Sequence, residues 1–482
     1  MPATSEIGRT FQVRTLEKTQ ITPALRKKVI GAYQYITGIY SFLTPDIHLG
    51  AKREIGTPLS RTNYAEYEQT FNSVLLATLL NALVNGSMLY FGPPGSGKTT
   101  TPEVVGQVLF GLTIQQIQAA TIYCHPNLTE EKMTGSFDIP KLMSGTKEVI
   151  WGTWVREFYR MLDEVNRMAP ETSSILMQAV DRRRVSYAGE VLEMATGPIH
   201  ATANYFDSGN FEMTPPFLDR FGISVNARGI SPAHFDSLFM PPGKIDRTKF
   251  SFDQAAREEI YAEIQSIGIE GGTLSLLSHI ASGLSSCHLA GNSWYDKNKS
   301  LFAENPGDCK ADACGFDSAR VLCSQAKEKG LTSRAVIALR DYSRALAWLL
   351  GRENVDNEVM QIVFGLVTAH RLSPTSKAMN GGESAAGTEF DKKLFARKTF
   401  DFPNHLFALG KASFDAQGEI YRAIDAFYDE IAQGTKSAKD VLIESEQLLI
   451  KVDAMEDPAK WDILQAVHFA RQMVRAKEQD QG

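Results

Sequence analysis

The sequence has no apolar run long enough to cross a bilayer, because its longest, Val74 to Val84, is interrupted by Thr78 and Asn81, whereas a membrane span needs about 20 residues. The first twenty residues are interspersed with charged side chains and lack the apolar segment of a secretory signal. A large excess of one charge is also missing, since 50 basic residues face 56 acidic ones and the net charge is −6. We therefore expect a cytoplasmic protein with no membrane span and no overall attraction to nucleic acid.

Cysteine is scarce, and the five cysteines do not form the even set expected of a disulfide framework. Cys124 falls in an apolar strand-like run, where a buried core position is expected. The other four cluster in a stretch rich in glycine, proline and lysine, beside His288. They suit tetrahedral zinc ligation, but their spacing is irregular and unpaired core cysteines are the alternative interpretation. The four candidate zinc ligands are Cys287, Cys309, Cys314 and Cys323.

Short apolar runs alternate with helical patterns in the first half of the chain, which is typical of a mostly parallel sheet covered by helices on both faces. A helix is expected from Tyr64 to Val84, ending at Asn85-Gly86. Beyond Ile230 the pattern becomes helical. The expected strands are Ser87 to Phe91, Ala120 to Cys124, Phe158 to Leu162, Ile199 to Ala203 and Gly222 to Asn226, and the clearest later helices are Phe252 to Ile267, Leu274 to Ser286, Arg334 to Leu350 and Val355 to His370.

A phosphate-binding loop directly follows the first of these strands. Gly92, Gly97, Lys98 and Thr99 fit the pattern G-x-x-x-x-G-K-[ST], in which backbone N–H groups surround a phosphate, the lysine reaches the β and γ phosphates and the hydroxyl holds Mg²⁺. Pro102 disfavours a regular second helical turn and predicts a kink. The loop residues expected to bind ATP are Gly92, Pro93, Pro94, Gly95, Ser96, Gly97, Lys98, Thr99 and Thr100.

Two acidic residues end the strand-like run from Phe158 to Leu162. A carboxylate at a strand end can hold Mg²⁺ through water, and the next one can polarise an attacking water, so we assign the metal to Asp163 with Thr99 and the base to Glu164. Arg160 is an awkward residue for a buried strand, and a surface Asp-Glu pair at a helix start is the plainer alternative.

These motifs and four others resemble the MoxR family of AAA+ ATPases, in the clade with an insert in helix 2. The resemblance runs from about Tyr64 to Leu372. It rests on Asp163-Glu164-Val165-Asn166-Arg167, Thr202-Ala203-Asn204, Leu218-Asp219-Arg220-Phe221, His125-Pro126-Asn127-Leu128 with Met133-Thr134-Gly135, and Thr332-Ser333-Arg334-Ala335, in which serine replaces the proline of the family.

The resemblance implies roles for three further residues. Asn204 would be the strand-end sensor that orients the lytic water, and Arg220 the arginine that a subunit contributes to its neighbour's nucleotide. Arg334 would reach the nucleotide as a residue of the lid. A salt-bridged loop arginine is the alternative for Arg220.

Two hairpins are also implied, one as the helix 2 insert at Asp138 to Trp154, with strand-like residues around Ser144, and one at Arg184 to Met194. In assembled rings of the family both face the pore or the substrate. From the bare sequence they are only hairpins.

The predicted fold class is α/β: a P-loop AAA+ domain with a parallel sheet, then an α-helical lid domain, with mainly helical extensions at both ends. The predicted divisions are 1–60 for the N-terminal extension, 61–230 for the nucleotide-binding domain, 231–372 for the lid with a cysteine-containing insertion at 286–325, 373–392 for a flexible linker, and 393–482 for a C-terminal helical segment.

The resemblance implies an ATPase that uses ATP and Mg²⁺ and works as a ring, with six subunits as the expected number. Such a ring remodels a protein client or helps to insert a metal cofactor, with a von Willebrand factor A-domain protein as partner. A nucleic-acid motor of a restriction or defence system is one alternative, which the acidic balance disfavours. A nucleotide-gated scaffold is another, although a pure switch has little need of Glu164.

Overall fold

The computed structural model describes residues 22–40, 43–55, 64–204, 211–228, 244–287, 322–328, 330–375, 378, 400–433, 438–454, 460, 464 and 467. Its centre is a five-stranded sheet whose paired strands are all parallel, in the order β11-β3-β10-β7-β4. The strands are β3 (Ser87–Gly92), β4 (Thr121–Tyr123), β7 (Arg160–Asp163), β10 (Ile199–Asn204) and β11 (Ile223–Asn226). The expected strands and the α/β class are thereby confirmed.

Helices cover both faces of this sheet, as strands that are almost entirely buried require. On one face lie α2 (Ser73–Leu83), every residue of which is buried, and α3 (Thr100–Phe110). An apolar core separate from that of α2 and α3 lies on the other face of the sheet, and α8 (Pro170–Arg182) contributes Leu176 and Ala179 to it. The smaller helices of this part are α4 (Ile114–Ala119), α5 (Glu130–Thr134), α7 (Thr153–Arg156), η2 (Val165–Arg167) and α9 (Pro215–Leu218).

The buried arginine of β7 has a direct physical explanation. Arg160 is fully buried, and its guanidinium donates to the carbonyls of Trp154 (3.0 Å), Val155 (3.4 Å), Phe158 (3.3 Å) and Ala195 (2.8 Å). Carbonyls thus accept the hydrogen bonds that water would otherwise accept, which makes the burial tolerable. Burial, and to a smaller extent the nearby Arg183, lowers the pKa of Arg160 to about 10.

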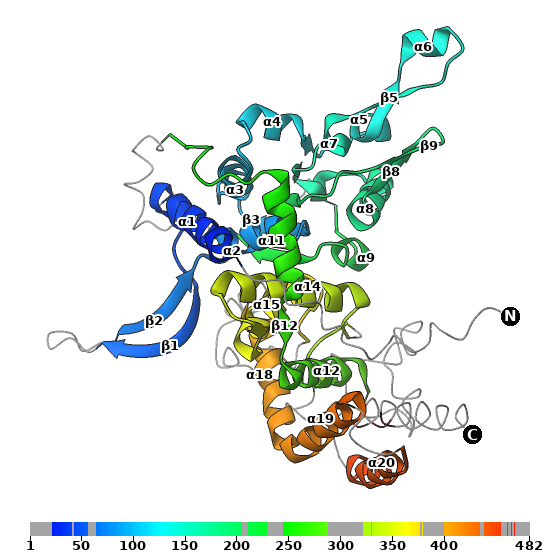
Figure 1. Cartoon of the computed structure of the whole chain (residues 1–482). Helices are drawn as coiled ribbons and strands as arrows, with labels where there is room; N and C mark the ends of the chain where they lie inside the picture. The colour runs from blue at the N-terminus through cyan, green and yellow to red at the C-terminus, as the bar shows by residue number, and fades with distance from the viewer. Residues whose placement is uncertain are drawn as a thin grey trace.

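The helical part that follows shares an apolar core with α2, and most of it lies below the sheet in Figure 1. It consists of α11 (Gln254–Ser266), α12 (Gly271–Ser285), η6 (Leu322–Ser324), α14 (Ser333–Leu350) and α15 (Asn357–Thr368), with the short strands β12 (Gly268–Ile269) and β13 (Asn354–Val355) paired in parallel. It also contacts α2 through a buried polar pair, in which the Tyr342 hydroxyl donates to Asn81 Oδ1 at 2.7 Å. The expected helices of this region are present.

The chain segments at either end join the same core rather than standing apart from it. Helix α1 (Pro23–Ile39) buries Val29 and Ile36, and α18 (Asp401–Ala416) buries Leu406 and Phe407, all in the core that α2 shares with the helical part. Helices α19 (Gly418–Gln433) and α20 (Ala438–Asp453) form a separate small core. At the start of the predicted linker, Thr375 donates its backbone N–H to Gln325 O at 2.9 Å.

Three local expectations were wrong. Tyr64 to Phe71 forms strand β2 (Tyr64–Phe71), paired with β1 (Ile47–Ile55), and the helix begins only after Asn72, whose side chain accepts from Leu75 N. The loop helix α3 begins at Thr100, which places Pro102 in its first turn, where a missing N–H matters little. One continuous helix results.

The third correction concerns the insert. Strands β5 (Gly135–Phe137) and β6 (Val149–Trp151) pair antiparallel, and the residues before Ser144 form helix α6 (Ile139–Met143) instead of strand. Asp138 caps this helix by accepting from Lys141 N at 3.2 Å. Figure 1 shows α6 at the end of an arm that projects from the body. The second hairpin, β8 (Arg184–Tyr187) with β9 (Glu190–Glu193), is present where it was predicted.

Among the described residues, no helix is both long and apolar enough to span a bilayer.

Candidate active site

The loop that the sequence predicts to bind phosphate follows β3 and leads into α3. Its amides therefore lie at a helix N-terminus, where anions are favoured. Gly95 and Gly97 have φ values of +73° and +78°, a conformation that residues with a side chain rarely adopt. The sequence pattern therefore has a backbone reason at both glycines. Gly97 O also accepts from Thr101 N at 3.0 Å, which fixes the loop to the first turn of the helix.

Lys98 lies within this loop and is only 7% exposed. Its Nζ donates to Gly92 O at 2.7 Å and to Pro93 O at 2.6 Å. Burial lowers the pKa of Lys98, and the negative charges of Asp163 and Glu164 partly offset that effect. A cation held this way among loop carbonyls is suited to exchange them for phosphate oxygens.

Hydroxyl groups from two elements meet the Asp163 carboxylate at the end of β7. Thr99 Oγ1 donates to Asp163 Oδ1 at 3.3 Å, and Thr202 Oγ1 donates to the same oxygen at 2.6 Å. Carboxylate and hydroxyl oxygens are the ligands that Mg²⁺ prefers, so Asp163 and Thr99 fit the metal assigned to them. Thr202 was not among the predicted site residues, although its place two residues before the end of β10, which pairs with β7, could have indicated it.

Glu164 has an unusual backbone and a fixed side chain. Its φ of +57° places a non-glycine residue in the left-handed region, which costs of order 1–3 kcal/mol and tends to occur at functional sites. Its N–H donates to Thr202 Oγ1 at 2.9 Å, and its Oε1 accepts from Asn204 Nδ2 at 2.7 Å. Asn166 Nδ2 in turn donates to Asn204 O at 2.9 Å. The two predicted water-handling residues, Glu164 and Asn204, are therefore in direct contact.

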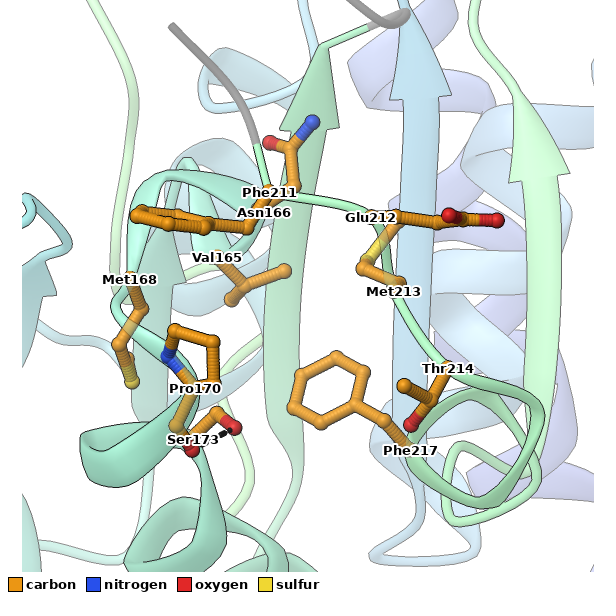
Figure 2. Close-up of a pocket in the computed structure, with 10 residues that line it drawn as sticks. All are labelled: Val165, Asn166, Met168, Pro170, Ser173, Phe211, Glu212, Met213, Thr214 and Phe217. Carbon is orange, nitrogen blue, oxygen red and sulfur yellow. Dashed lines mark hydrogen bonds between the residues drawn. The ribbon is translucent and has the colours of Figure 1, made fainter.

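A small apolar cleft of about 80 Å³ lies beside the turn that carries Glu164. Figure 2 shows Val165 of that turn facing Phe217 of α9 across it. Phe211 N donates to Asn166 O at 2.7 Å and closes one side. Ligand sites for small molecules usually measure about 300–1,000 Å³, so this cleft is not a nucleotide site.

Arg220 and Arg334 lie at the other edge of the sheet. Arg220 O accepts from Ser87 Oγ at 3.1 Å, at the start of β3, whereas the predicted phosphate-binding loop follows the end of that strand. The six residues of β3 separate the two edges by roughly 17 Å. Arg220 also donates from Nη1 to Pro216 O.

Arg334 is held at this same edge by two carboxylates. It donates to Asp181 from Nε (2.8 Å) and from Nη2 (2.9 Å), and Nη1 donates to Asp219 Oδ2 at 3.3 Å. Asp219 immediately precedes Arg220 and is itself bonded by Arg371 Nε at 3.0 Å. The structure therefore does not bring Arg334 to the predicted phosphate-binding loop of its own chain, and the two arginines share one edge instead.

The candidate zinc ligands are only partly within the described residues. Cys287 follows α12 and Cys323 belongs to the adjacent η6, while Cys309, Cys314 and His288 lie outside the described residues. No group of three His, Cys, Asp or Glu side chains suited to a metal occurs in the part of the chain that the structure describes. Cys124 is buried beside β4, as expected of a core cysteine.

Comparisons with known protein families match two parts of the chain, one that contains the sheet and one in the helical part after it. Residues 87–221 match the AAA domain family (dynein-related subfamily), and residues 320–389 match the AAA lid domain family. Protein MoxR of Paracoccus denitrificans is 23% identical over 326 residues, which cover 64% of this chain and 88% of MoxR.

One further relative and one solved structure are also similar to the chain. An uncharacterised protein of Staphylococcus epidermidis is 30% identical over 148 residues, 29% of this chain and 54% of that protein, so the chain spans about half of it. The crystal structure of a candidate ATPase from Cytophaga hutchinsonii is 16% identical, with a TM-score of 0.48, and covers 78% of this chain and 97% of that one. The chain thus has a region similar to the AAA domain family, followed by a region similar to the AAA lid domain family, and it is similar to MoxR over most of the length of that protein.

Proposed function

We propose that the protein hydrolyses ATP at the cluster around Lys98 and Glu164. The observation that supports this most strongly is the meeting of five side chains at the ends of three neighbouring strands: Lys98, Thr99, Asp163, Glu164 and Asn204. Each has the chemistry that one part of the reaction needs: a cation for phosphate, oxygens for Mg²⁺, a carboxylate base and an amide beside that base.

In this proposal the chain's residues divide the work. Lys98 and the loop amides bind the phosphates, and Thr99 and Asp163 hold Mg²⁺, which supplies charge neutralisation on the phosphates when bound. Glu164 takes a proton from the attacking water. Asn204 holds the Glu164 carboxylate in place through its 2.7 Å hydrogen bond and lies where it can also orient the water.

We further propose that the site is completed by a neighbouring subunit in a ring. Arg220 and Arg334 lie at the sheet edge opposite their own loop. A head-to-tail arrangement, which closes into a ring, places that edge against the next subunit's loop. Both arginines would then act across the interface, so Arg334 takes a different role from the own-nucleotide contact expected of it.

The finer biological role is a proposal by homology alone. A cytoplasmic ring, with six subunits as the expected number, that remodels a protein client or assists metal insertion with a von Willebrand factor A-domain partner suits a MoxR relative. The zinc site at the four cysteines stays a prediction. Zinc analysis of the wild type and of a Cys309→Ser/Cys314→Ser variant tests it, with about one zinc per chain expected in the wild type and none in the variant.

The experiment for ATP hydrolysis compares Lys98→Ala with Glu164→Gln. Lys98 contacts ground-state phosphates, so its loss should abolish nucleotide binding, measured with a fluorescent ATP analogue. Glu164 acts on water, so Glu164→Gln should bind ATP as the wild type does while phosphate release falls by about a hundredfold or more. Equal ATP affinity in the wild type and Lys98→Ala contradicts the proposed site.

A further inference from the structure

Besides its hydrogen bond with Asn204, Glu164 has a contact with a charged side chain that the proposed reaction does not use. Arg167 Nη1 lies 3.2 Å from Glu164 Oε2, the carboxylate oxygen that Asn204 does not contact. The two residues are joined through the one-turn helix η2, and Arg167 N donates to Glu164 O at 2.9 Å. Arg167 therefore contacts both the side chain and the backbone of the proposed base.

Among the described residues, Glu164 is the ion-pair partner that the structure gives Arg167. Arg167 Nε is buried and has no hydrogen-bond partner in the described structure. The contact of Arg167 with Glu164 joins two charged groups, and such contacts are shorter and stronger than those between neutral groups.

The two restraints on the Glu164 carboxylate come from different elements. Asn204 approaches from the end of β10, and Arg167 from the end of η2. Asn166, between Glu164 and Arg167, is fixed by Nδ2 donating to Asn204 O at 2.9 Å. The carboxylate is thus held from both sides while its backbone stays in the left-handed conformation, an arrangement that fixes direction more than it adds stability.

We propose that Arg167 is a positioning residue that orients Glu164 for attack by water on the γ-phosphate. The proposal rests on the ATPase activity proposed above. An ion pair between side chains that are 41% and 34% exposed contributes at most about 1 kcal/mol to folding, so the fold should tolerate its loss. A misplacement of about 1 Å in a reacting group, by contrast, can cost about a hundredfold in rate.

The test measures kcat and KM for ATP in the wild type, Arg167→Gln, Arg167→Lys and the control Arg422→Gln, an exposed arginine of α19 outside the AAA domain. Arg167→Gln should lower kcat by between about tenfold and a hundredfold, with KM within about twofold of the wild type. Arg167→Lys should recover part of the loss because it keeps the charge, and Arg422→Gln should behave as the wild type.

A double-mutant comparison separates orientation of Glu164 from any independent effect. In single-turnover measurements, Arg167→Gln should slow the wild-type background but add almost nothing to Glu164→Gln, because the group that it orients is already disabled. Multiplying defects contradict the proposal, and so does unchanged or raised kcat in Arg167→Gln. A wild type with no turnover removes the proposed function and this proposal together, whereas normal turnover in Arg167→Gln removes this proposal alone.

Discussion

Two buried histidines make stability depend on pH in a direction that the structure fixes. Burial, together with the smaller effect of Arg183, lowers the pKa of His200 to about 3. Burial and the nearby Arg371 lower the pKa of His370 well below its usual value. Both rings are therefore neutral in the folded chain near pH 6, while an unfolded histidine titrates near 6.5. Their contribution is fully present above pH 6.5 and is lost as the pH falls from there toward the folded value.

For His200 alone the expected loss between pH 7 and pH 5 is about 2 kcal/mol. Chemical denaturation at both pH values measures the free energy of unfolding. Its decrease from pH 7 to pH 5 should be smaller in His200→Gln than in the wild type, by about 2 kcal/mol. That variant keeps a polar group beside Tyr90, whose hydroxyl lies 2.9 Å from His200 Nδ1. Equal pH dependence in the wild type and the variant contradicts a depressed pKa at His200.

At the scale of residues, the sequence predicts which site residues meet. They lie at the carboxyl ends of strands, and parallel strands bring these ends to one edge of the sheet. Asp163, Glu164 and Asn204 meet for that reason. The sequence does not predict which edge a lid residue reaches. Arg334 donates to Asp181, which lies 153 positions earlier, and the sequence around the two residues does not indicate this pairing.

At the scale of elements, a buried hydroxyl of helix α14 contacts both α2 and the start of β3. The Tyr342 hydroxyl donates to Asn81 Oδ1, and both residues are buried. Tyr342→Phe leaves that amide oxygen without its donor, which costs about 1–3 kcal/mol. Urea denaturation should show this loss. Tyr261→Phe, at a tyrosine of α11 that is 40% exposed, should change stability by less than about 0.5 kcal/mol. Equal stability of the two variants contradicts the assigned role of Tyr342.

Element boundaries were harder to predict than element types. Phe71, Val74 and Leu75 fit a helical period, yet the chain changes from strand to helix between the first two, at Asn72. The capping side chain decides this, because Asn72 Oδ1 satisfies the N–H of Leu75, at the third residue of the helix. In the insert Asp138 has the same role for α6, and apolar spacing alone carries no sign of either cap.

At the scale of the whole molecule, the proposed ring assigns complementary halves of one reaction centre to the two edges of the sheet. The loop, Asp163 and Glu164 lie at one edge, and Arg220 and Arg334 at the other. Under this proposal a lone subunit lacks the arginine that acts on the transition state, and loss of such a residue costs on the order of 10³ to 10⁵ in rate. Arg220→Ala should bind ATP normally and hydrolyse it poorly.

The most direct test of a shared site is the ATPase rate of a mixture of Lys98→Ala and Arg220→Ala subunits, after their exchange has been verified. Each variant alone should be inactive. In a random equal mixture about a quarter of head-to-tail interfaces pair an intact loop with an intact Arg220, so roughly a quarter of the wild-type rate should return. No recovery of activity in fully exchanged mixtures would contradict the claim that neighbouring subunits complete each other's sites.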